Sequence, residues 1–194
     1  MLRQLMSLKV FGFLWGLVFL FNPLAQGAIM TGGKNGITID FIYDYQCPYC
    51  HAMYPEIKKL SSEGYTIRWM PVAIIHNPLS LEEATGAIAS TQCQGGFNRY
   101  QSETMAGTVL SGDSINQLTE TFNTLCPQFI ATQHSSWVES ALDENTQALQ
   151  AYQVQGVPVT VLYPTAHPSQ KITLQGEVSP QTIKEAINAL NHPF

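Results

Sequence analysis

The feature that most constrains this chain is a pair of cysteines separated by two residues, Cys47-Pro48-Tyr49-Cys50. The pair follows an apolar, β-branched run at residues 37–43 and opens a helical pattern that continues to about residue 62. Two cysteines three positions apart at a strand-to-helix junction can close a small disulfide ring. The pattern therefore predicts a redox-active pair.

The place of Cys47 at the start of the predicted helix separates the roles of the two cysteines. Unpaired backbone N–H groups and the positive end of the helix dipole favour a thiolate there. Pro48 suits the first helical position, because its missing N–H costs nothing at that point. Cys50 lies about one turn further into the helix. We therefore expect Cys47 to form the mixed disulfide with a substrate and Cys50 to resolve it.

Half of a structural zinc site would show the same spacing. Such a site needs four ligands, and Cys93 and Cys126 stand alone, without a second Cys or His at zinc-finger spacing. We therefore expect no metal. We also expect no cofactor, because the disulfide itself carries the two electrons of an exchange reaction.

The N-terminal segment has the organisation of a secretory signal peptide. Arg3 and Lys9 lie in an acid-free start, twelve apolar or small residues follow at 10–21, and Ala25-Gln26-Gly27 offers small residues for cleavage after Gly27. An uncleaved anchor is the alternative, although a membrane span needs about 20 apolar residues. Export to the periplasm or another oxidising compartment makes disulfides the expected state of the four cysteines.

The charge balance excludes two classes of partner. The chain has 9 Lys and Arg residues against 14 Asp and Glu, and residues 1–27 contain two of the cations and none of the acids. A chain this acidic, without a basic run, is unsuited to nucleic acid or to an anionic membrane surface. The residues after position 27 suffice for one domain with a substantial core.

The pattern along the chain predicts an α/β frame with an all-helical insertion. Residues 28–36 should form a short flexible lead-in, and 37–194 a single domain. A strand, a helix and a strand within residues 37–70 make a βαβ unit, so the sheet should be partly parallel. We expect strands at 37–43, 65–70, 157–163 and 171–174, and helices at 47–62, over about 79–152 with several breaks, and at 180–190.

This order resembles that of the secreted thiol:disulfide interchange proteins of the Dsb class, in the thioredoxin superfamily. Three motifs carry the resemblance: the C-x-x-C pair, Pro55 eight residues after its first cysteine, and Gly156-Val157-Pro158 opening a strand. The resemblance covers about residues 37–190 and implies a thioredoxin-like fold. It also implies that Pro158 is a cis-proline beside the disulfide, and that the Val157 backbone docks an extended substrate segment. An ordinary trans-proline at a strand start is the alternative.

The middle of the chain is similar to the catalytic domain of the DsbC/DsbG isomerases, mainly over residues 68–90 and 97–107. Those proteins place further cysteines in the helical block, so the resemblance implies a structural disulfide between Cys93 and Cys126 that closes a loop of about 34 residues. A second redox-active pair is the alternative. The isomerases also carry an N-terminal dimerisation domain, for which the lead-in here is too short, so we expect a monomer. They usually have Thr before the cis-proline, whereas Val157 is typical of DsbA-type oxidases.

Four further side chains near the pair are candidates for a role in the site: Tyr49, His51, Asp40 and Asp44. Tyr49 influences the redox potential in the family and presents an aromatic face to the substrate. His51 either contacts the region of the thiolate or is a solvated first-turn residue. The buried acid that the family often has six residues before the first cysteine is absent, because Phe41 occupies that position. We expect Asp40 and Asp44 at the ends of their strand, solvated or capping.

The resemblance implies an exported thiol:disulfide oxidoreductase that isomerises, reduces or forms disulfides in unfolded or misoxidised exported proteins. A membrane redox partner would reset the Cys47–Cys50 pair: a DsbD-like reductase for an isomerase, or a DsbB-like oxidase for a DsbA-like dithiol oxidase, which is the alternative function. A more distant alternative is a non-enzymatic protein, either a chaperone-like binder or a carrier of a soft metal such as Cu(I).

Overall fold

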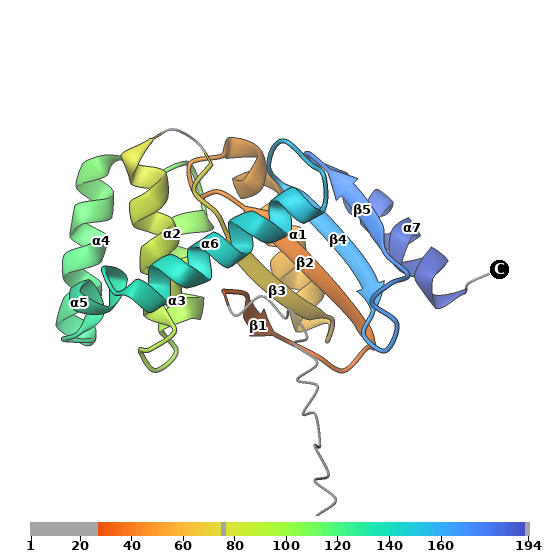
Figure 1. The fold of residues 1–194 in the computed structure, drawn as a ribbon, viewed down its shortest axis with the longest axis horizontal. Helices are drawn as coiled ribbons and strands as arrows, with labels where there is room; N and C mark the ends of the chain where they lie inside the picture. The colour runs from red at the N-terminus through yellow and green to blue at the C-terminus, as the bar shows by residue number, and fades with distance from the viewer. Residues whose placement is uncertain (1–26, 75–76, 193–194) are drawn as a thin grey trace, which may run out of the picture.

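The computed structural model describes residues 27–74 and 77–192, so the predicted signal peptide lies outside the described residues except for Gly27. A five-stranded mixed sheet forms the centre of the molecule, in the order β1-β3-β2-β4-β5 (Figure 1). The strands are β1 (Ile29–Thr31), β2 (Ile37–Tyr43), β3 (Thr66–Pro71), β4 (Val159–Pro164) and β5 (Ile172–Gln175). The helices are α1 (Pro48–Ser62), α2 (Pro78–Ser90), α3 (Gly96–Met105), α4 (Gly112–Leu125), α5 (Phe129–Gln133), α6 (Ser136–Ala151) and α7 (Pro180–Asn191).

Strand β2 is the central strand of the sheet. It pairs in parallel with β3, across the α1 connection, and antiparallel with β4. All seven of its residues are buried, because helices cover both faces of the sheet. A strand buried on both faces appears in sequence as a near-continuous apolar run, which is the pattern of residues 37–43.

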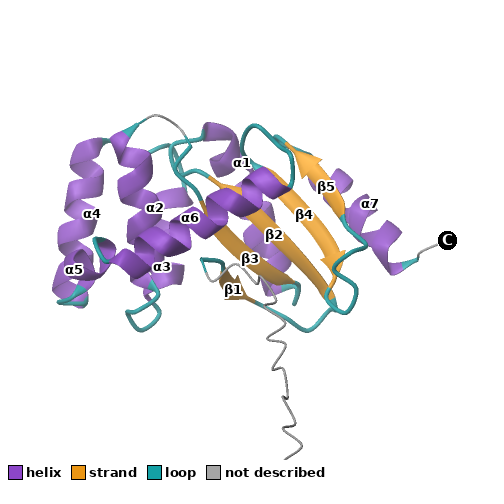
Figure 2. Cartoon of the chain, viewed as in Figure 1, coloured by secondary structure: helices purple, strands orange, loops and turns teal. Residues whose placement is uncertain are grey.

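Different helices cover the two faces (Figure 2). Helices α1 and α7 lie on one face, where Phe41 and Trp69 belong to one buried cluster with Ile57 of α1 and Ile183 of α7. Helix α6 crosses the opposite face, where Leu149 belongs to a second cluster with side chains of β2, β3 and β4. This packing holds α1 against the sheet and places its N-terminus at the carboxyl end of β2.

The expectation that Asp40 lies solvated or capping at a strand end is wrong. Asp40 is in the middle of β2 and is fully buried. Its carboxylate accepts hydrogen bonds from Arg68 at 3.0 Å, from Tyr152 at 2.8 Å and from Tyr163 at 2.9 Å. Arg68 is its register partner on β3, so the sheet itself brings the two charges together. A buried charge is tolerated only when it is paired and hydrogen-bonded.

The segment predicted to be a flexible lead-in contains a strand. Ile29–Thr31 form β1, which pairs antiparallel with β3 at the edge of the sheet. The Thr31 hydroxyl accepts a hydrogen bond from the Trp69 indole at 2.8 Å. Three residues next to glycines carry too weak a local signal to be recognised, because it is pairing with β3 that makes them a strand.

Helices α2 to α6 form one helical block: α2 to α5 lie beside the sheet, at the left in Figure 1, and α6 extends from them across the sheet face. Cys93, in the connection between α2 and α3, forms a disulfide with Cys126 at the end of α4, with a sequence separation of 33. The disulfide therefore joins the two halves of the block. None of the helices within residues 27–74 and 77–192 has the length and apolar character needed to cross a membrane.

Candidate active site

The turn from β2 into α1 presents Cys47. Cys47 is the N-cap residue of α1, with an extended backbone, and Pro48 occupies the first helical turn. The Cys47 N–H donates to the Asp44 carbonyl at 3.1 Å, and the Cys50 N–H donates to the Cys47 carbonyl at 3.0 Å. Cys47 therefore lies at the N-terminus of α1, beside the N–H groups of Tyr49 and Cys50. Both cysteines are free thiols.

The surroundings of the two sulfur atoms shift the pKa values of Cys47 and Cys50 in opposite directions. A hydrogen bond from the Cys50 thiol, together with the N–H groups of Cys50 and Tyr49, lowers the pKa of Cys47 to about 6 against the opposing effect of burial. Burial raises the pKa of Cys50 far above its ordinary value. Cys47 is therefore mostly thiolate at neutral pH, whereas Cys50 holds its proton. This is the division that an attacking and a resolving thiol require.

Val157 and Pro158, directly before β4, form one wall of the site, opposite Cys47. The Val157–Pro158 peptide bond is cis, as the resemblance implies. The Val157 carbonyl oxygen lies 3.6 Å from the Cys47 sulfur, close enough to accept a hydrogen bond from its thiol. The Pro158 carbonyl accepts from the Gly176 N–H at 2.8 Å, which fixes the start of β4 against the residue after β5. A substrate disulfide that reaches Cys47 must therefore pass beside the Val157 backbone.

The exposed rim of the site is aromatic. The Tyr49 side chain is 61% exposed and projects beside Cys47, which is only 5% exposed. A substrate would therefore meet the Tyr49 ring before it meets the sulfur. A hollow of about 480 Å³ lies on the neighbouring side of α1, between Pro48 and the Gly107–Val109 segment.

His51 is buried, so of its two alternatives the solvated first-turn histidine is wrong. Its ring nitrogens lie 2.7 Å from the Tyr45 carbonyl oxygen and 3.1 Å from the Gly107 carbonyl oxygen. A carbonyl oxygen only accepts, so the ring donates from whichever nitrogen carries a proton. His51 thereby connects α1 to the connection between α3 and α4, and it lines the hollow together with Pro48.

A polar network behind Cys47 was not recognised from the sequence. Gln46, the residue before the nucleophile, donates from its side-chain amide to the Glu83 carboxylate at 2.6 Å and to the Leu110 carbonyl at 3.3 Å. Its amide oxygen accepts from the Asn77 side chain at 3.2 Å. Gln46 thus joins the active-site turn to the N-terminus of α2. The only local signal is an acid, Glu83, at the head of an apolar helical stretch.

Two carboxylates belong to this network, and both are fully buried. Asp44 lies directly after β2, at the strand end where it was expected, but it is neither solvated nor a helix N-cap. It accepts from the Gln46 N–H at 2.9 Å, from the Ile74 N–H at 3.0 Å and from the Ser80 hydroxyl at 2.6 Å. Burial raises the pKa of Glu83 to about 7. The site therefore holds one carboxylate satisfied by hydrogen bonds and another that changes charge near neutral pH.

The structure brings together all the residues predicted for the exchange site and leaves Cys93 and Cys126 outside it. The site is formed by the N-terminus of α1 and the segment that leads into β4. The two cysteines of the disulfide lie in the helical block. Within the described residues, no group of three or more His, Cys, Asp or Glu side chains could hold a metal ion. Two thiolates alone remain a possible ligand pair for a soft metal.

Comparison with known proteins gives one family match. The family described as a thioredoxin-like domain matches residues 24–191. No curated protein sequence matches the chain.

Several solved structures share the fold. A thioredoxin-like oxidoreductase from Silicibacter pomeroyi DSS-3 is 18% identical, with a TM-score of 0.73 over 88% of this chain and 97% of its own. The thiol-disulfide exchange protein alpha-DsbA2 from Wolbachia pipientis is 16% identical, with a TM-score of 0.71 over 85% and 88%. A periplasmic thioredoxin-like protein from Salmonella enterica serovar Typhimurium is 21% identical, with a TM-score of 0.63 over 87% and 91%.

Proposed function

This chain belongs to the thioredoxin-like domain family, and we propose that it is a thiol–disulfide oxidoreductase that exchanges disulfides with exported protein substrates through Cys47 and Cys50. The predicted α/β fold with its helical insertion is confirmed by the family match and by the structural similarity. The observation that carries the proposal is the thiolate-favouring position of Cys47 at the N-terminus of α1, beside the N–H groups of Tyr49 and Cys50.

The reaction follows from the different acidities of the two thiols. The Cys47 thiolate attacks one sulfur of a substrate disulfide, forms a mixed disulfide and releases the other sulfur as a thiolate. Cys50 then gives up its proton and attacks the Cys47 sulfur. This step closes the Cys47–Cys50 disulfide and releases the second substrate thiolate. Read in reverse, the same steps transfer the disulfide to a substrate dithiol.

The wall at Val157 suits an extended substrate segment. A peptide that lies along residues 156–157, the segment that leads into β4, can pair with that segment through main-chain hydrogen bonds, which is the β-augmentation mode. Main-chain pairing selects extended or unfolded chains and is indifferent to most side chains. This supports unfolded or misoxidised proteins as the substrate class.

The Cys47 environment makes the Cys47–Cys50 disulfide more oxidising than that of a dithiol with ordinary pKa values. A stabilised thiolate favours the reduced form of the pair, so its disulfide is more oxidising. The Cys47 pKa of about 6 lies between those of thioredoxin, about 7, and of DsbA, about 3.5. The potential should therefore lie between about −270 mV and about −120 mV. Equilibration with glutathione measures it, and a value near −270 mV would instead favour the reductase or DsbC/DsbG-like isomerase direction, with a membrane reductase as partner.

Export is supported by the N-terminal sequence and by the Salmonella protein of the same fold, which is described as periplasmic. We propose that residues 1–27 direct export and are then removed. N-terminal sequencing of the protein recovered from a periplasmic extract tests this, and a mature chain that begins elsewhere than Ala28 would revise the cleavage site.

Replacing Cys47, the proposed nucleophile, tests the proposed function. Cys47→Ser should abolish catalysed insulin reduction and refolding of scrambled ribonuclease, because serine cannot form the mixed disulfide. The replacement is nearly isosteric, so the circular dichroism spectrum should not change. If Cys47→Ser leaves both activities intact but removes tight Cu(I) binding, the chain is a soft-metal carrier and the oxidoreductase proposal fails.

A further inference from the structure

The helical block is far more acidic than the rest of the chain. Residues 78–152 contain eight Asp and Glu residues and a single cation, Arg99. That cation is already paired, because its guanidinium lies 2.6 Å from the Glu103 carboxylate one turn along α3. A field of one sign over a surface attracts partners of the opposite charge.

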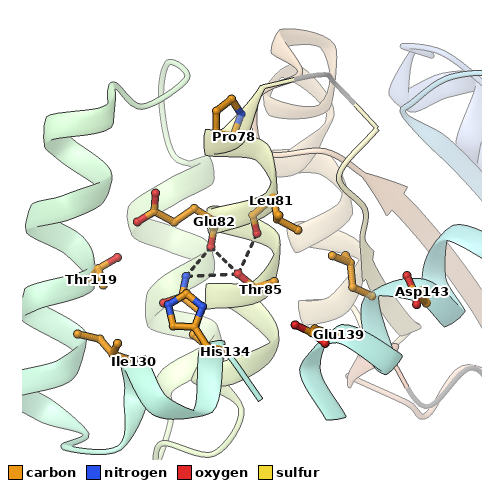
Figure 3. Close-up of a pocket in the computed structure, with 11 residues that line it drawn as sticks. Pro78, Leu81, Glu82, Thr85, Thr119, Ile130, His134, Glu139 and Asp143 are labelled. Atoms are coloured by element: carbon orange, nitrogen blue, oxygen red, sulfur yellow. Dashed lines mark hydrogen bonds between the residues drawn. The ribbon is translucent and has the colours of Figure 1, made fainter. Parts of the chain in front are cut away.

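A hollow of about 510 Å³ opens in this block between α2, α4, α5 and α6. Carboxylates of Glu82 on α2 and of Glu139 and Asp143 on α6 border it (Figure 3). The described residues that line it include no Lys or Arg, and His134 is the remaining titratable group. The hollow therefore has an acidic rim.

The inside of the hollow is apolar. Leu81 is 51% exposed and Ile130 is 38% exposed, and both side chains line the hollow beside the buried Leu142. The Gln133 amide donates to the Glu82 carbonyl at 2.9 Å and to the Thr85 hydroxyl at 3.3 Å. These bonds hold α5 against α2, so the shape of the hollow is preformed. Apolar surface inside an acidic rim fits an apolar side chain with cationic neighbours.

The hollow begins close to the active-site turn. Pro78, at the N-terminus of α2, is part of its lining. The residue before it, Asn77, donates to the side chain of Gln46 at 3.2 Å, and Gln46 directly precedes Cys47. A polypeptide held at Cys47 therefore needs only a short extension to reach the hollow.

We propose that this hollow is a second contact site for the protein substrate of Cys47, and that it takes an apolar side chain flanked by Lys or Arg. The inference rests on the proposed function and adds a substrate preference to it. An exposed charge pair contributes about 0.2–1 kcal/mol, so two rim carboxylates together should change affinity about two- to thirtyfold. The effect should weaken in high salt, because exposed charges are screened.

Direct binding is the first test and needs no redox chemistry. Two fluorescent, cysteine-free peptides are compared by anisotropy, one with a Lys-Leu-Lys core and one with a Glu-Leu-Glu core. The lysine peptide should bind at least threefold more tightly at low salt. The double substitution Glu139→Gln with Asp143→Asn should remove that preference. The control pair Glu120→Gln with Glu185→Gln removes two exposed charges outside the hollow and should keep the preference.

Equal binding of the two peptides, or equal losses in both variant pairs, would overturn the proposal. If Lys-Ser-Lys binds as tightly as Lys-Leu-Lys, the surface is a general cation attractor without an apolar subsite, and the proposal also fails. Binding that appears only after residues 1–27 are removed would assign the hollow to the basic, apolar leader of this chain, which contradicts a substrate site.

Turnover separates this inference from the proposed function. The same two cores are placed beside a disulfide in peptide substrates, and KM and kcat are measured at low salt. We expect the Glu139→Gln/Asp143→Asn variant to raise KM for the lysine substrate three- to tenfold, with kcat unchanged. Turnover without a charge preference would leave the oxidoreductase standing and overturn the second site. Preferential peptide binding without any turnover would support the hollow as a binding site but refute the oxidoreductase.

Discussion

The two cysteine pairs of this chain are in opposite chemical situations. Cys47 and Cys50 are free thiols three positions apart at the N-terminus of α1. Cys93 and Cys126 are joined in a disulfide across 33 positions of the helical block. The first pair lies at the N-terminus of α1, beside the Val157 backbone. The second pair joins the α2–α3 connection to the end of α4, two segments that would otherwise be linked only by packing.

The contrast shows that the local backbone decides what a cysteine pair can do. A pair at a helix N-terminus has its thiolate stabilised and can be opened and closed repeatedly. A pair that closes a long loop restricts the unfolded chain and stabilises the fold. The catalytic pair should therefore control rate, and the distant pair should control stability.

The largest expected effect is on turnover. Replacing Cys50 by serine, Cys50→Ser, leaves the Cys47 thiolate without a resolving thiol, so the mixed disulfide persists. We expect multiple-turnover activity to fall more than about a thousandfold, an amount equal to about 4 kcal/mol in the barrier. Non-reducing electrophoresis should show a substrate adduct that disappears when Cys47 is also replaced.

The next expected effect concerns stability and the Cys93–Cys126 disulfide. Removing it in the double variant Cys93→Ser with Cys126→Ser should lower the free energy of unfolding by about 3 kcal/mol and the melting temperature by about 6–12 °C. Turnover at 20 °C should change less than twofold. Urea denaturation followed by circular dichroism measures the first effect. A large loss of turnover in a still-folded double variant would mean that the second pair takes part in exchange.

The sequence reveals the features whose causes are local. The buried run of β2, the helix start at Pro48 and the order of elements around Pro158 each leave a pattern within a few residues, and the structure places them where they were predicted. Their predicted boundaries differ from the observed ones by one or two residues, since caps and pairing decide the ends.

The features that the sequence did not reveal depend on distant partners. Asp40 is buried because Arg68, Tyr152 and Tyr163, from three other segments, converge on it. Glu83 belongs to the active site only through its contact with Gln46, 37 positions away. No spacing rule connects such residues. A buried acid is visible in sequence only as a charge within an apolar run, and that signal does not name its partner.

Glu83 lies in the helical block and contacts Gln46 of the active-site turn, so we expect its charge to affect the stability of both segments. Burial raises the pKa of its carboxyl from 4.5 to about 7. The native state therefore holds this proton more tightly than the unfolded chain, and the resulting stability is full below pH 4.5 and is lost as the pH rises through 7. Glu83→Gln keeps an acceptor oxygen for Gln46 and cannot ionise.

We expect Glu83→Gln to raise the free energy of unfolding at pH 8 by about 3 kcal/mol and to change it little at pH 4.5. Urea denaturation at both pH values measures the difference. Glu82→Gln, which removes the carboxylate of a less buried neighbour on α2, is the control variant. An equal effect of Glu83→Gln at both pH values would show that the carboxyl does not change its charge in this range.

The smallest expected effect is a difference in thiol reactivity between Cys47 and Cys50. The Cys47 pKa falls from 9 to about 6, so the thiolate stabilises the folded, reduced protein. This stabilisation is full above pH 9 and is lost as the pH falls through 6. Alkylation of the reduced protein by iodoacetamide should therefore be nearly constant above pH 7 and fall about tenfold per pH unit below 6. In Cys47→Ser, the buried Cys50 should not react over the same range.

The hydrogen bond from Cys50 is the largest cause of the low Cys47 pKa, ahead of the N–H groups of α1. Cys50→Ala should therefore move the midpoint of Cys47 alkylation upward by one pH unit or more, whereas Cys93→Ser with Cys126→Ser should leave it in place. Absorbance of the thiolate at 240 nm gives the same midpoint without a reagent. An unchanged midpoint in Cys50→Ala would assign the stabilisation to the start of the helix, and the two cysteine pairs would then differ by their backbone position alone.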